Sequence, residues 1–201
     1  MSTTLEAWAL AAAQSLTVYH EDVGSPEKPA QLEMIASAVT QAARETKGWP
    51  LGKKALIAAE FGMIENETFA SLRIHRNECN LKKECDAYRF RGQLQARAIS
   101  IFQLHASALS DPSLWPQLGF MTFDSTLLSA KEASRALVRG YRYCAAQKAQ
   151  GNPIALMYTA TAGRGCDLSK WQGWKPRLAT YERLLRVVVP KEQASGPKVA
   201  G

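Results

Sequence analysis

Residues 53–67 read Lys53-Lys-Ala-Leu-Ile-Ala-Ala-Glu-Phe-Gly-Met-Ile-Glu-Asn-Glu67. The apolar side chains recur three or four positions apart, which is the spacing of one face of an α-helix. This pattern predicts a helix over 53–67 that ends in two carboxylates, Glu65 and Glu67. A carboxylate flanked by apolar side chains at a helix end suits a general acid. The alternative is a solvated surface glutamate.

The chain on both sides of this stretch is also typical of helices, and a mainly α fold is expected. The exception is residues 73–97, which lack a sustained helical period and predict a loop or a small hairpin. Gly, Pro and Asn punctuate the remainder. Further helices are expected over 5–19, 32–43, from about Ala98, from a cap at Asp124 or Ser125 through Cys144, over 154–161 and over 175–187.

The composition is that of a globular protein with a basic surface. Of its 201 residues, 46% are hydrophobic and 21% are charged, which excludes a mainly disordered chain. A formal charge of +7 suggests a polyanionic neighbour: nucleic acid, a membrane face or an anionic wall polymer. No apolar run approaches the ~20 residues that span a bilayer. The N-terminus lacks the basic and apolar regions of a signal peptide.

Three short segments carry the candidate chemistry. Glu67-Thr68 comes first, Ser100-Ile-Phe-Gln103 second, and Ala155-Leu-Met-Tyr158 before Gly163 third. A glutamine in an apolar run requires a polar partner, which is either a ligand or a backbone group. A tyrosine on a helix that runs into glycines either places its hydroxyl in a cleft or belongs to the core before a glycine cap.

In this order the segments resemble the lysozyme-like lytic transglycosylases and goose-type lysozymes. Those enzymes show Glu-Ser/Thr, then Gly-Leu-Met-Gln, then Ala-x-x-Tyr-Asn-x-Gly. The likeness covers about residues 50–186; Ser100 stands where the family usually has Gly, and Thr159 where it has Asn. A narrower resemblance is to phage-type and bacterial members, on Glu67-Thr68, Ile74-His75, Cys79, Glu84-Cys85-Asp86, Ala96-Arg97 and Gln103.

The resemblance implies a lysozyme-like helical fold that cleaves the β-1,4 bond between N-acetylmuramic acid and N-acetylglucosamine. Glu67 would be the general acid, with Glu65 in reserve; the two project ~200° apart on a helix. Gln103, Tyr158 and Ser100 would bind substrate, and Tyr158 would also orient Glu67. Neither a metal nor an organic cofactor is implied.

No second carboxylate occupies a comparable motif. Glu84, Asp86 and Asp111 are candidates only because they lie in irregular stretches. This pattern is typical of family members in which the substrate's own groups assist the glutamate. The product is then a 1,6-anhydro sugar for a lytic transglycosylase, or a reducing end for a lysozyme.

The resemblance and the composition together divide the chain. Residues 1–48 would form an N-terminal helical segment packed on the core and 49–189 the catalytic domain, while the polar residues 190–201, with Gly and Pro, predict a flexible tail. Such a bacteriolytic enzyme, an endolysin for example, acts in the periplasm or at the cell wall. Delivery by a phage particle, a holin or a secretion apparatus is expected. The partner is the peptidoglycan glycan strand, and the chain is a monomer unless it joins a virion or secretion assembly.

Four cysteines allow three connectivities. Cys79 and Cys85 are six apart across a Lys-Lys turn, which suits a small closed loop. Cys144 and Cys166 would tie the long helix to the loop after the Tyr158 helix. We expect the disulfides Cys79–Cys85 and Cys144–Cys166; the alternatives are four reduced thiols or, weakly, a metal held by His75 with Cys79 and Cys85.

Other readings remain open at this stage. The basic stretch Arg89-Phe-Arg91 with Arg97 permits a nucleic-acid-binding module, although no stable nucleic-acid partner is expected. A catalytically silent wall-binding or structural protein of the same fold is a third reading. Trp171 and Trp174 are expected to cover a core edge rather than stack on a sugar. His20 and His105 are expected to be incidental polar residues.

Overall fold

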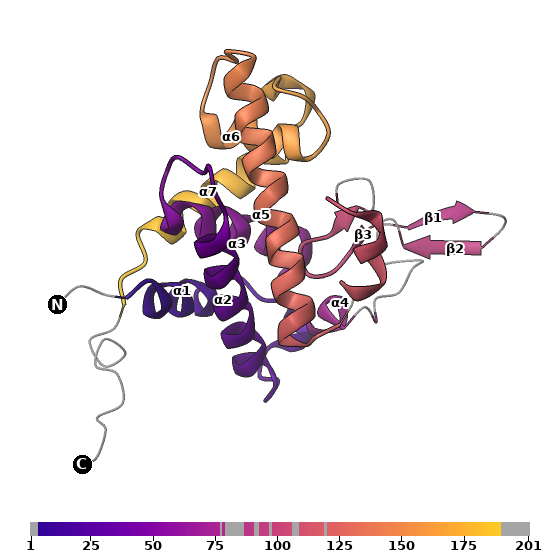
Figure 1. Cartoon of the computed structure of the whole chain (residues 1–201). Helices are drawn as coiled ribbons and strands as arrows, with labels where there is room; N and C mark the ends of the chain where they lie inside the picture. The colour runs from indigo at the N-terminus through magenta and orange to yellow at the C-terminus, as the bar shows by residue number, and fades with distance from the viewer. Residues whose placement is uncertain are drawn as a thin grey trace.

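The structure is a computed structural model that describes residues 4–76, 78, 87–90, 93–96, 98–105, 109–118 and 120–189. It is mainly helical, as the sequence predicts (Figure 1). The helices are α1 (Leu5–Gln14), α2 (Lys28–Glu45), α3 (Lys53–Thr68), α4 (Leu72–His75), α5 (Phe123–Ala146), α6 (Pro153–Thr161) and α7 (Trp174–Leu185). Short 3₁₀ turns lie at η1 (His20–Asp22), η3 (Pro112–Gln117) and η4 (Leu168–Lys170).

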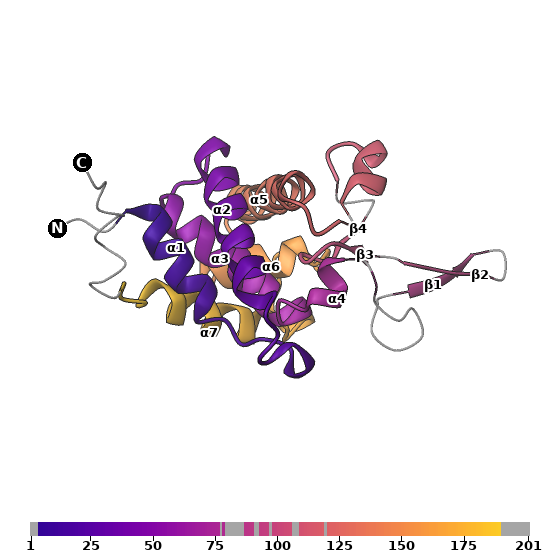
Figure 2. The same cartoon turned by 90° about the horizontal axis from the view of Figure 1, so that it is seen from below.

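Helix α3 is the centre of the fold. Twelve of its sixteen residues are buried, so it is covered on all sides rather than on one face. Figure 2 shows α3 between α2 and α5 on one side and α7 on the other, and all three contact it. One hydrophobic cluster joins residues of 1–48, such as Trp8 and Val39, to residues of α3 and α5. Glu67 therefore lies on the last turn of a helix fixed by the core.

The predicted hairpin is confirmed within 73–97, but the start of that stretch is helical. Strands β1 (Ala87–Phe90) and β2 (Gln93–Ala96) pair antiparallel, with Ala87 opposite Ala96. Before them, α4 spans Leu72–His75, and the Ser71 hydroxyl caps it by accepting from Ile74 N at 3.4 Å. This single turn is too short to show a helical period in the sequence.

The prediction of a helix from about Ala98 is wrong. Strand β3 (Ala98–Ile99) pairs with β4 (Leu104–His105) around a turn at 100–103. The backbone N–H and the side-chain Nε2 of Gln103 both donate to Ser100 O, at 3.0 Å each. Ile101 and Phe102 are fully buried in the core, so tertiary burial overrides the local helical spacing.

Several helix ends differ from the prediction. The cap of α5 is Thr122 rather than Asp124 or Ser125, because the Thr122 hydroxyl accepts from Ser125 N at 3.3 Å. Helix α1 ends at Gln14, and Asn152 caps α6 with Pro153 as its first residue.

Within the part of the chain that the structure describes, none of the helices is both long and apolar enough for a membrane span. The predicted tail, 190–201, lies outside the described residues.

The disulfide predicted between Cys144 and Cys166 is confirmed, with a sulfur–sulfur distance of 2.08 Å. It ties the end of α5 to the loop that follows α6. The second predicted pair, Cys79–Cys85, lies outside the described residues.

Removing this bond in a Cys144→Ser/Cys166→Ser variant is expected to lower the free energy of unfolding by about 3 kcal/mol. The bond spans 22 residues, and loop-closure entropy in the unfolded chain gives a stabilisation of this size. Urea unfolding of the parent, oxidised and reduced, beside the variant measures it. A variant as stable as the oxidised parent would contradict the expectation.

Glu60 is a carboxyl group enclosed by the core. It is fully buried on α3 and accepts a hydrogen bond from the Ser134 hydroxyl of α5, while its Oε2 has no hydrogen-bond partner among the described residues. Burial raises the pKa of Glu60 well above its usual range. The folded protein therefore keeps this proton at pH values where the unfolded chain has lost it.

Stability is accordingly expected to fall as the pH rises above about 4.5, the ordinary pKa of a glutamate. One extra proton bound by the folded state gives a slope of about 1.4 kcal/mol per pH unit until the folded group ionises. Glu60→Gln removes this slope. Urea titrations of parent and variant at several pH values measure it, and identical slopes in the two proteins would show that Glu60 does not titrate as described.

Candidate active site

Two cavities border Glu67. The first, the Gln103 cavity, has a volume of about 330 Å³ and the second, the Tyr19 cavity, about 260 Å³. Glu67 is the residue that both share. The Gln103 cavity is lined by Met63, Glu67, Ala98, Phe102, Gln103, Leu104, His105, Ala136, Tyr158, Thr161, Ala162, Arg164, Trp171 and Arg177. The Tyr19 cavity is lined by Tyr19, Glu67, Thr68, Phe69, Ser71, Arg73 and Ile74.

Arg177 of α7 fixes the Glu67 carboxylate. Its Nη2 donates to Glu67 Oε1, and its Nη1 donates to Gly173 O at 2.6 Å. The guanidinium also lies 4.7 Å from the ring centroid of Trp171. The side chain of Glu67 is 34% exposed and that of Arg177 only 9%. The carboxylate therefore faces the cavities while its partner is anchored in the protein.

Tyr158 does not orient Glu67 as the sequence led us to expect. Its hydroxyl donates to Ala59 O at 2.9 Å, two turns before Glu67 on α3. Burial raises the pKa of this phenol, so it stays protonated. A Cβ at Gly62 would lie within contact distance of the Tyr158 hydroxyl, so the close approach of α6 to α3 requires glycine there. Tyr158 anchors α6 on α3 and lines the Gln103 cavity.

The backbone around Glu67 is held in left-handed conformations. Phe69 and Ala70 have φ of 48° and 50°, and Ser100 and Gln103 have 68° and 48°. Non-glycine residues adopt these angles only when the surrounding structure enforces them, and such residues gather at functional sites. The Thr68 hydroxyl links the two turns, because it lies 3.0 Å from Ile64 O and 3.1 Å from Ile101 O.

Ser100 and Gln103 have different places. Ser100 is buried and does not line either cavity; its hydroxyl accepts from Phe102 N at 3.3 Å. Its φ of 68° lies in the left-handed region that favours glycine. Gln103 does line the Gln103 cavity, with its Nε2 bonded to Ser100 O. Ser100 thus supports the turn, and Gln103 presents its amide to the cavity.

Substituting Gln103 by alanine is expected to reduce substrate turnover about three- to tenfold, the value of one neutral hydrogen bond. The loss of the bond to Ser100 O is expected to cost about 0.5–1.5 kcal/mol of stability. A turnover assay and urea unfolding give the two numbers. Full turnover combined with a much larger loss of stability would make Gln103 a purely structural residue.

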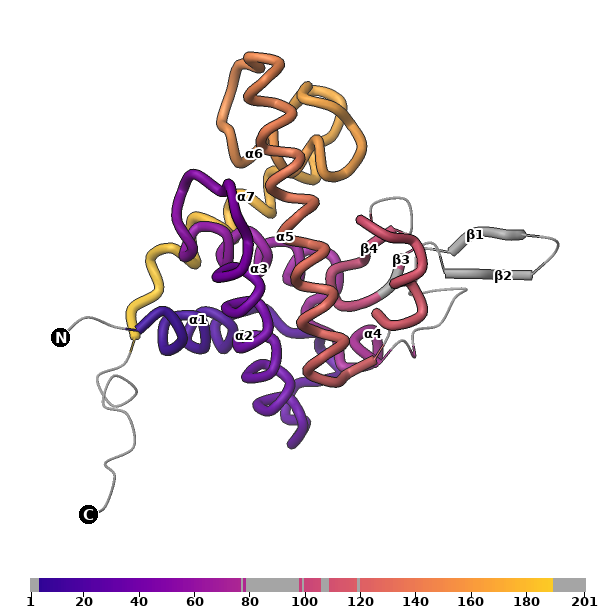
Figure 3. Tube along the Cα trace, in the orientation of Figure 1, coloured from indigo at the N-terminus to yellow at the C-terminus, as the bar shows by residue number. Residues whose placement is uncertain are grey.

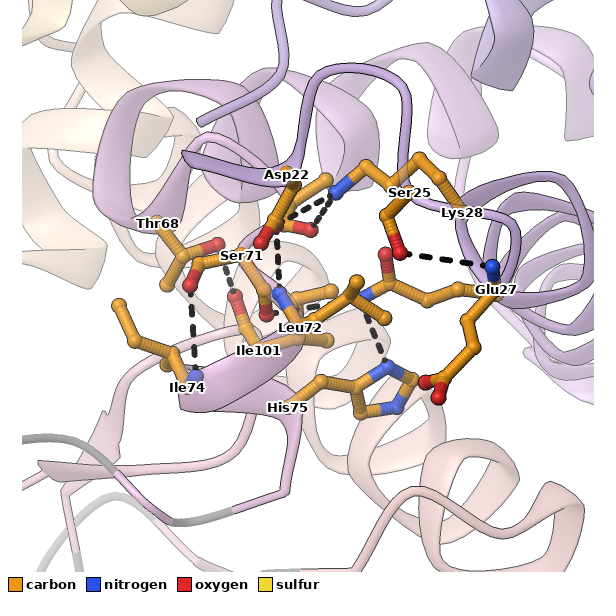
Figure 4. A network of polar contacts seen from close by, with 12 residues as sticks. Asp22, Ser25, Glu27, Lys28, Thr68, Ser71, Leu72, Ile74, His75 and Ile101 are labelled. Atoms are coloured by element: carbon orange, nitrogen blue, oxygen red, sulfur yellow. Dashed lines mark hydrogen bonds and ion pairs between the residues drawn. The ribbon is translucent and has the colours of Figure 1, made fainter. Parts of the chain in front are cut away.

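A buried polar network holds the turn after Glu67 (Figure 4). Lys28 Nζ donates to Asp22 Oδ2 at 3.1 Å and to Ala70 O, while Leu72 N donates to the same Asp22 oxygen at 2.8 Å. Both charged side chains are less than a tenth exposed. Burial lowers the pKa of Lys28, and the contact with Asp22 acts in the opposite direction. The network holds Ala70, through its carbonyl, in the left-handed turn after Glu67.

His75 belongs to the same network. Its Nδ1 lies 3.1 Å from Gln31 Nε2 and its Nε2 lies 2.8 Å from the Thr126 hydroxyl. Burial, with the nearby charge of Lys28, lowers the pKa of His75 to about 4, so the ring is neutral at physiological pH. Both nitrogens are engaged, and the other two members of the alternative metal site, Cys79 and Cys85, lie outside the described residues. Among the described residues, no cluster of three or more metal-ligating side chains is found.

Glu65 has a structural position. It is buried and accepts from Thr17 N at 2.9 Å, from the Thr180 hydroxyl at 2.7 Å and from Arg183 Nη2 at 2.5 Å. It lines neither cavity that borders Glu67. These contacts join α3 to α7 and to the segment after α1, in keeping with a direction ~200° away from Glu67.

The other candidate carboxylates do not reach the site. Asp111 accepts from Ser113 N at 2.8 Å and caps η3, while Glu84 and Asp86 lie outside the described residues. Among the described residues that line the two cavities, Glu67 is therefore the single carboxylate.

Several residues of the site were not predicted as such. Arg177 is 110 positions from Glu67 in the chain, and nothing in the local sequence indicates their contact. Trp171, expected at a core edge, lines the Gln103 cavity, whereas the Trp174 indole donates to Leu168 O at 3.1 Å. His105 also lines the cavity, and His20 lies against Tyr19 with the ring centroids 4.5 Å apart.

No family model, curated protein or solved structure matches the chain.

Proposed function

We propose that this chain is a peptidoglycan-cleaving glycosidase, a lytic transglycosylase or a lysozyme, with Glu67 as its general acid. The observation that carries the proposal is the position of Glu67 on the border of two cavities. A glycan strand that occupies both cavities has one of its bonds beside this carboxylate. The resemblance of the motifs around Glu67, Gln103 and Tyr158 supports the same activity.

The chemistry follows from a single carboxyl group. Protonated Glu67 gives its proton to the glycosidic oxygen, and the bond from that oxygen to the muramic C1 breaks through an oxocarbenium-like transition state. Glu67, now a carboxylate, takes a proton from the sugar's 6-hydroxyl as that oxygen closes a 1,6-anhydro ring. If water attacks instead, Glu67 takes its proton from water and a reducing end forms.

Arg177 has a defined part in this cycle. Arg177 donates to Glu67 Oε1, so Oε2 is the oxygen that would carry the transferred proton. After proton transfer the guanidinium stabilises the carboxylate that is left. In the same position the guanidinium lies over the ring of Trp171, which helps to hold it beside the cavity.

The cavities also suit an anionic strand. Arg73 lines the Tyr19 cavity, and Arg164 and Arg177 line the Gln103 cavity. The lactyl and peptide carboxylates of peptidoglycan are the groups that such side chains would bind. An enzyme of this kind would act in the periplasm or at the cell wall.

Mass spectrometry of sacculi treated with the purified protein tests the proposal. Soluble 1,6-anhydro muropeptides are expected from a lytic transglycosylase, and muropeptides with reducing ends from a lysozyme. Binding to sacculi without release of soluble products would favour the silent wall-binding reading. A salt-sensitive shift of short DNA, with intact sacculi, would favour the nucleic-acid reading.

A further inference from the structure

A basic groove lies apart from Glu67. It runs between the C-terminal end of α2 and one face of α5, two helices that lie side by side (Figures 1 and 3), and has a volume of about 730 Å³. None of its lining residues borders either Glu67 cavity. Five cations and one carboxylate line it: Lys47, Lys131, Arg135, Arg139, Arg142 and Glu45.

The cations form a stripe along α5. Positions 131, 135, 139 and 142 share one face, because residues three or four apart lie on the same side of a helix. Ala136, on another face of α5, lines the Gln103 cavity. The same helix therefore forms a wall of both sites, and the two sites face different directions.

Several contacts hold side chains of the groove in place. Arg135 Nη1 donates to Glu132 Oε1 and, at 3.0 Å, to the Ser110 hydroxyl. Lys131 Nζ lies 2.7 Å from Glu45 Oε2, which joins α5 to the end of α2. The guanidinium of Arg142 lies directly against Gly48, whose φ is 78°. A Cβ at that position would overlap the guanidinium, so this placement of Arg142 depends on glycine in the loop after α2.

We propose that this groove binds a sugar-phosphate unit of a phosphate-bearing glycan. Guanidinium groups bind phosphate through paired, charge-assisted hydrogen bonds, and lysine adds a point charge. The volume is that of a small-molecule site. The lining also includes the buried apolar residues Ala42 and Val138 and the hydroxyl-bearing Thr46 and Tyr143, a mixture that suits a sugar ring.

The shape favours this ligand over duplex nucleic acid. A duplex is bound across a broad basic surface, with contacts to many phosphates. Here the cations line one groove between two helices. The same sugar-phosphate chemistry occurs in phosphate-bearing wall polymers and in phosphorylated glycolipid headgroups. The inference does not depend on the activity proposed for Glu67.

Binding of N-acetylglucosamine 6-phosphate, measured by calorimetry, tests the inference. The groove variant is Lys47→Gln/Arg142→Gln, since neither residue belongs to the Glu67 site. The control is Lys148→Gln/Lys170→Gln, which removes the same charge from exposed positions outside the groove. We expect the groove variant to bind about tenfold more weakly or worse, the control to bind like the parent, and unphosphorylated N-acetylglucosamine not to bind.

Equal weakening in the two variants would overturn the inference, because net charge alone would then explain binding. So would absence of binding to the parent, or tighter groove-dependent binding of a short DNA duplex. Two further ligands identify the source of the sugar phosphate: a soluble poly(glycerol phosphate) that bears sugars, and phosphatidylcholine vesicles that contain a phosphorylated glycolipid. Groove-dependent binding of either ligand supports the site. Digestion of sacculi by the groove variant is expected at the parental rate, which separates this test from that of Glu67.

Discussion

Replacing Glu67 by glutamine is expected to slow the release of muropeptides from sacculi by about 10²–10⁴, the usual value of general acid catalysis. The amide has no proton to give at neutral pH. Its oxygen still accepts from Arg177, so the contact between α3 and α7 is kept. Partly exposed ion pairs contribute about 0–1 kcal/mol, and the variant should therefore unfold close to the parent in urea.

Glu65→Gln is the matched control on the same helix. Glu65 lies outside both cavities, so the folded variant is expected to keep most of its activity. It loses a buried contact with Arg183, and its stability should fall more than that of Glu67→Gln. If Glu65→Gln is inactive while Glu67→Gln still releases muropeptides from sacculi, the general acid is Glu65 and not Glu67. If both variants are fully active, the enzyme proposal fails.

Replacing Lys28 by methionine is expected to lower the free energy of unfolding by about 3–5 kcal/mol, because Asp22 is left charged and buried without its partner. The change also frees Ala70 O in the left-handed turn after Glu67. At about 2–4 °C per kcal/mol for a chain of this size, the melting temperature should fall by roughly 6–20 °C.

Arg44 on the same helix provides the control. It pairs with Glu6 at the surface, where both side chains are about half exposed. Arg44→Met is expected to shift the melting temperature by no more than about 2–4 °C. Calorimetry on both variants compares the pairs directly. Similar losses of melting temperature in the two variants would mean that the buried Lys28–Asp22 pair contributes no more to stability than the exposed Arg44–Glu6 pair. Lys28 would then not be the residue that holds the turn after Glu67.

The sequence was most informative where the determinants are local. The apolar spacing of 53–67 predicted α3 and the position of Glu67 at its end, and proline and asparagine marked the start of α6. The short separation of Cys144 and Cys166 was sufficient for their pairing. In each case the signal lies within a few turns of one helix or one loop.

The predictions were wrong where residues distant in the sequence determine the local structure. The 100–103 turn depends on burial of Ile101 and Phe102, and on the Thr68 hydroxyl from α3. Arg177 meets Glu67 only because α7 packs on α3. Tyr158 was assigned to the wrong partner because its direction is set by the approach of α6 to Gly62. None of these contacts leaves a pattern in a single sequence.

The disulfide has a consequence for the shape of the Gln103 cavity. Cys166 lies in the loop between Arg164 and Trp171, two residues that line the Gln103 cavity. In a reducing cytosol the bond to α5 would be absent, and this wall of the cavity would lose its covalent anchor. The position of Arg164 and Trp171 along the Gln103 cavity would then depend on non-covalent contacts alone, so the shape of this cavity is tied to the redox state of a single bond.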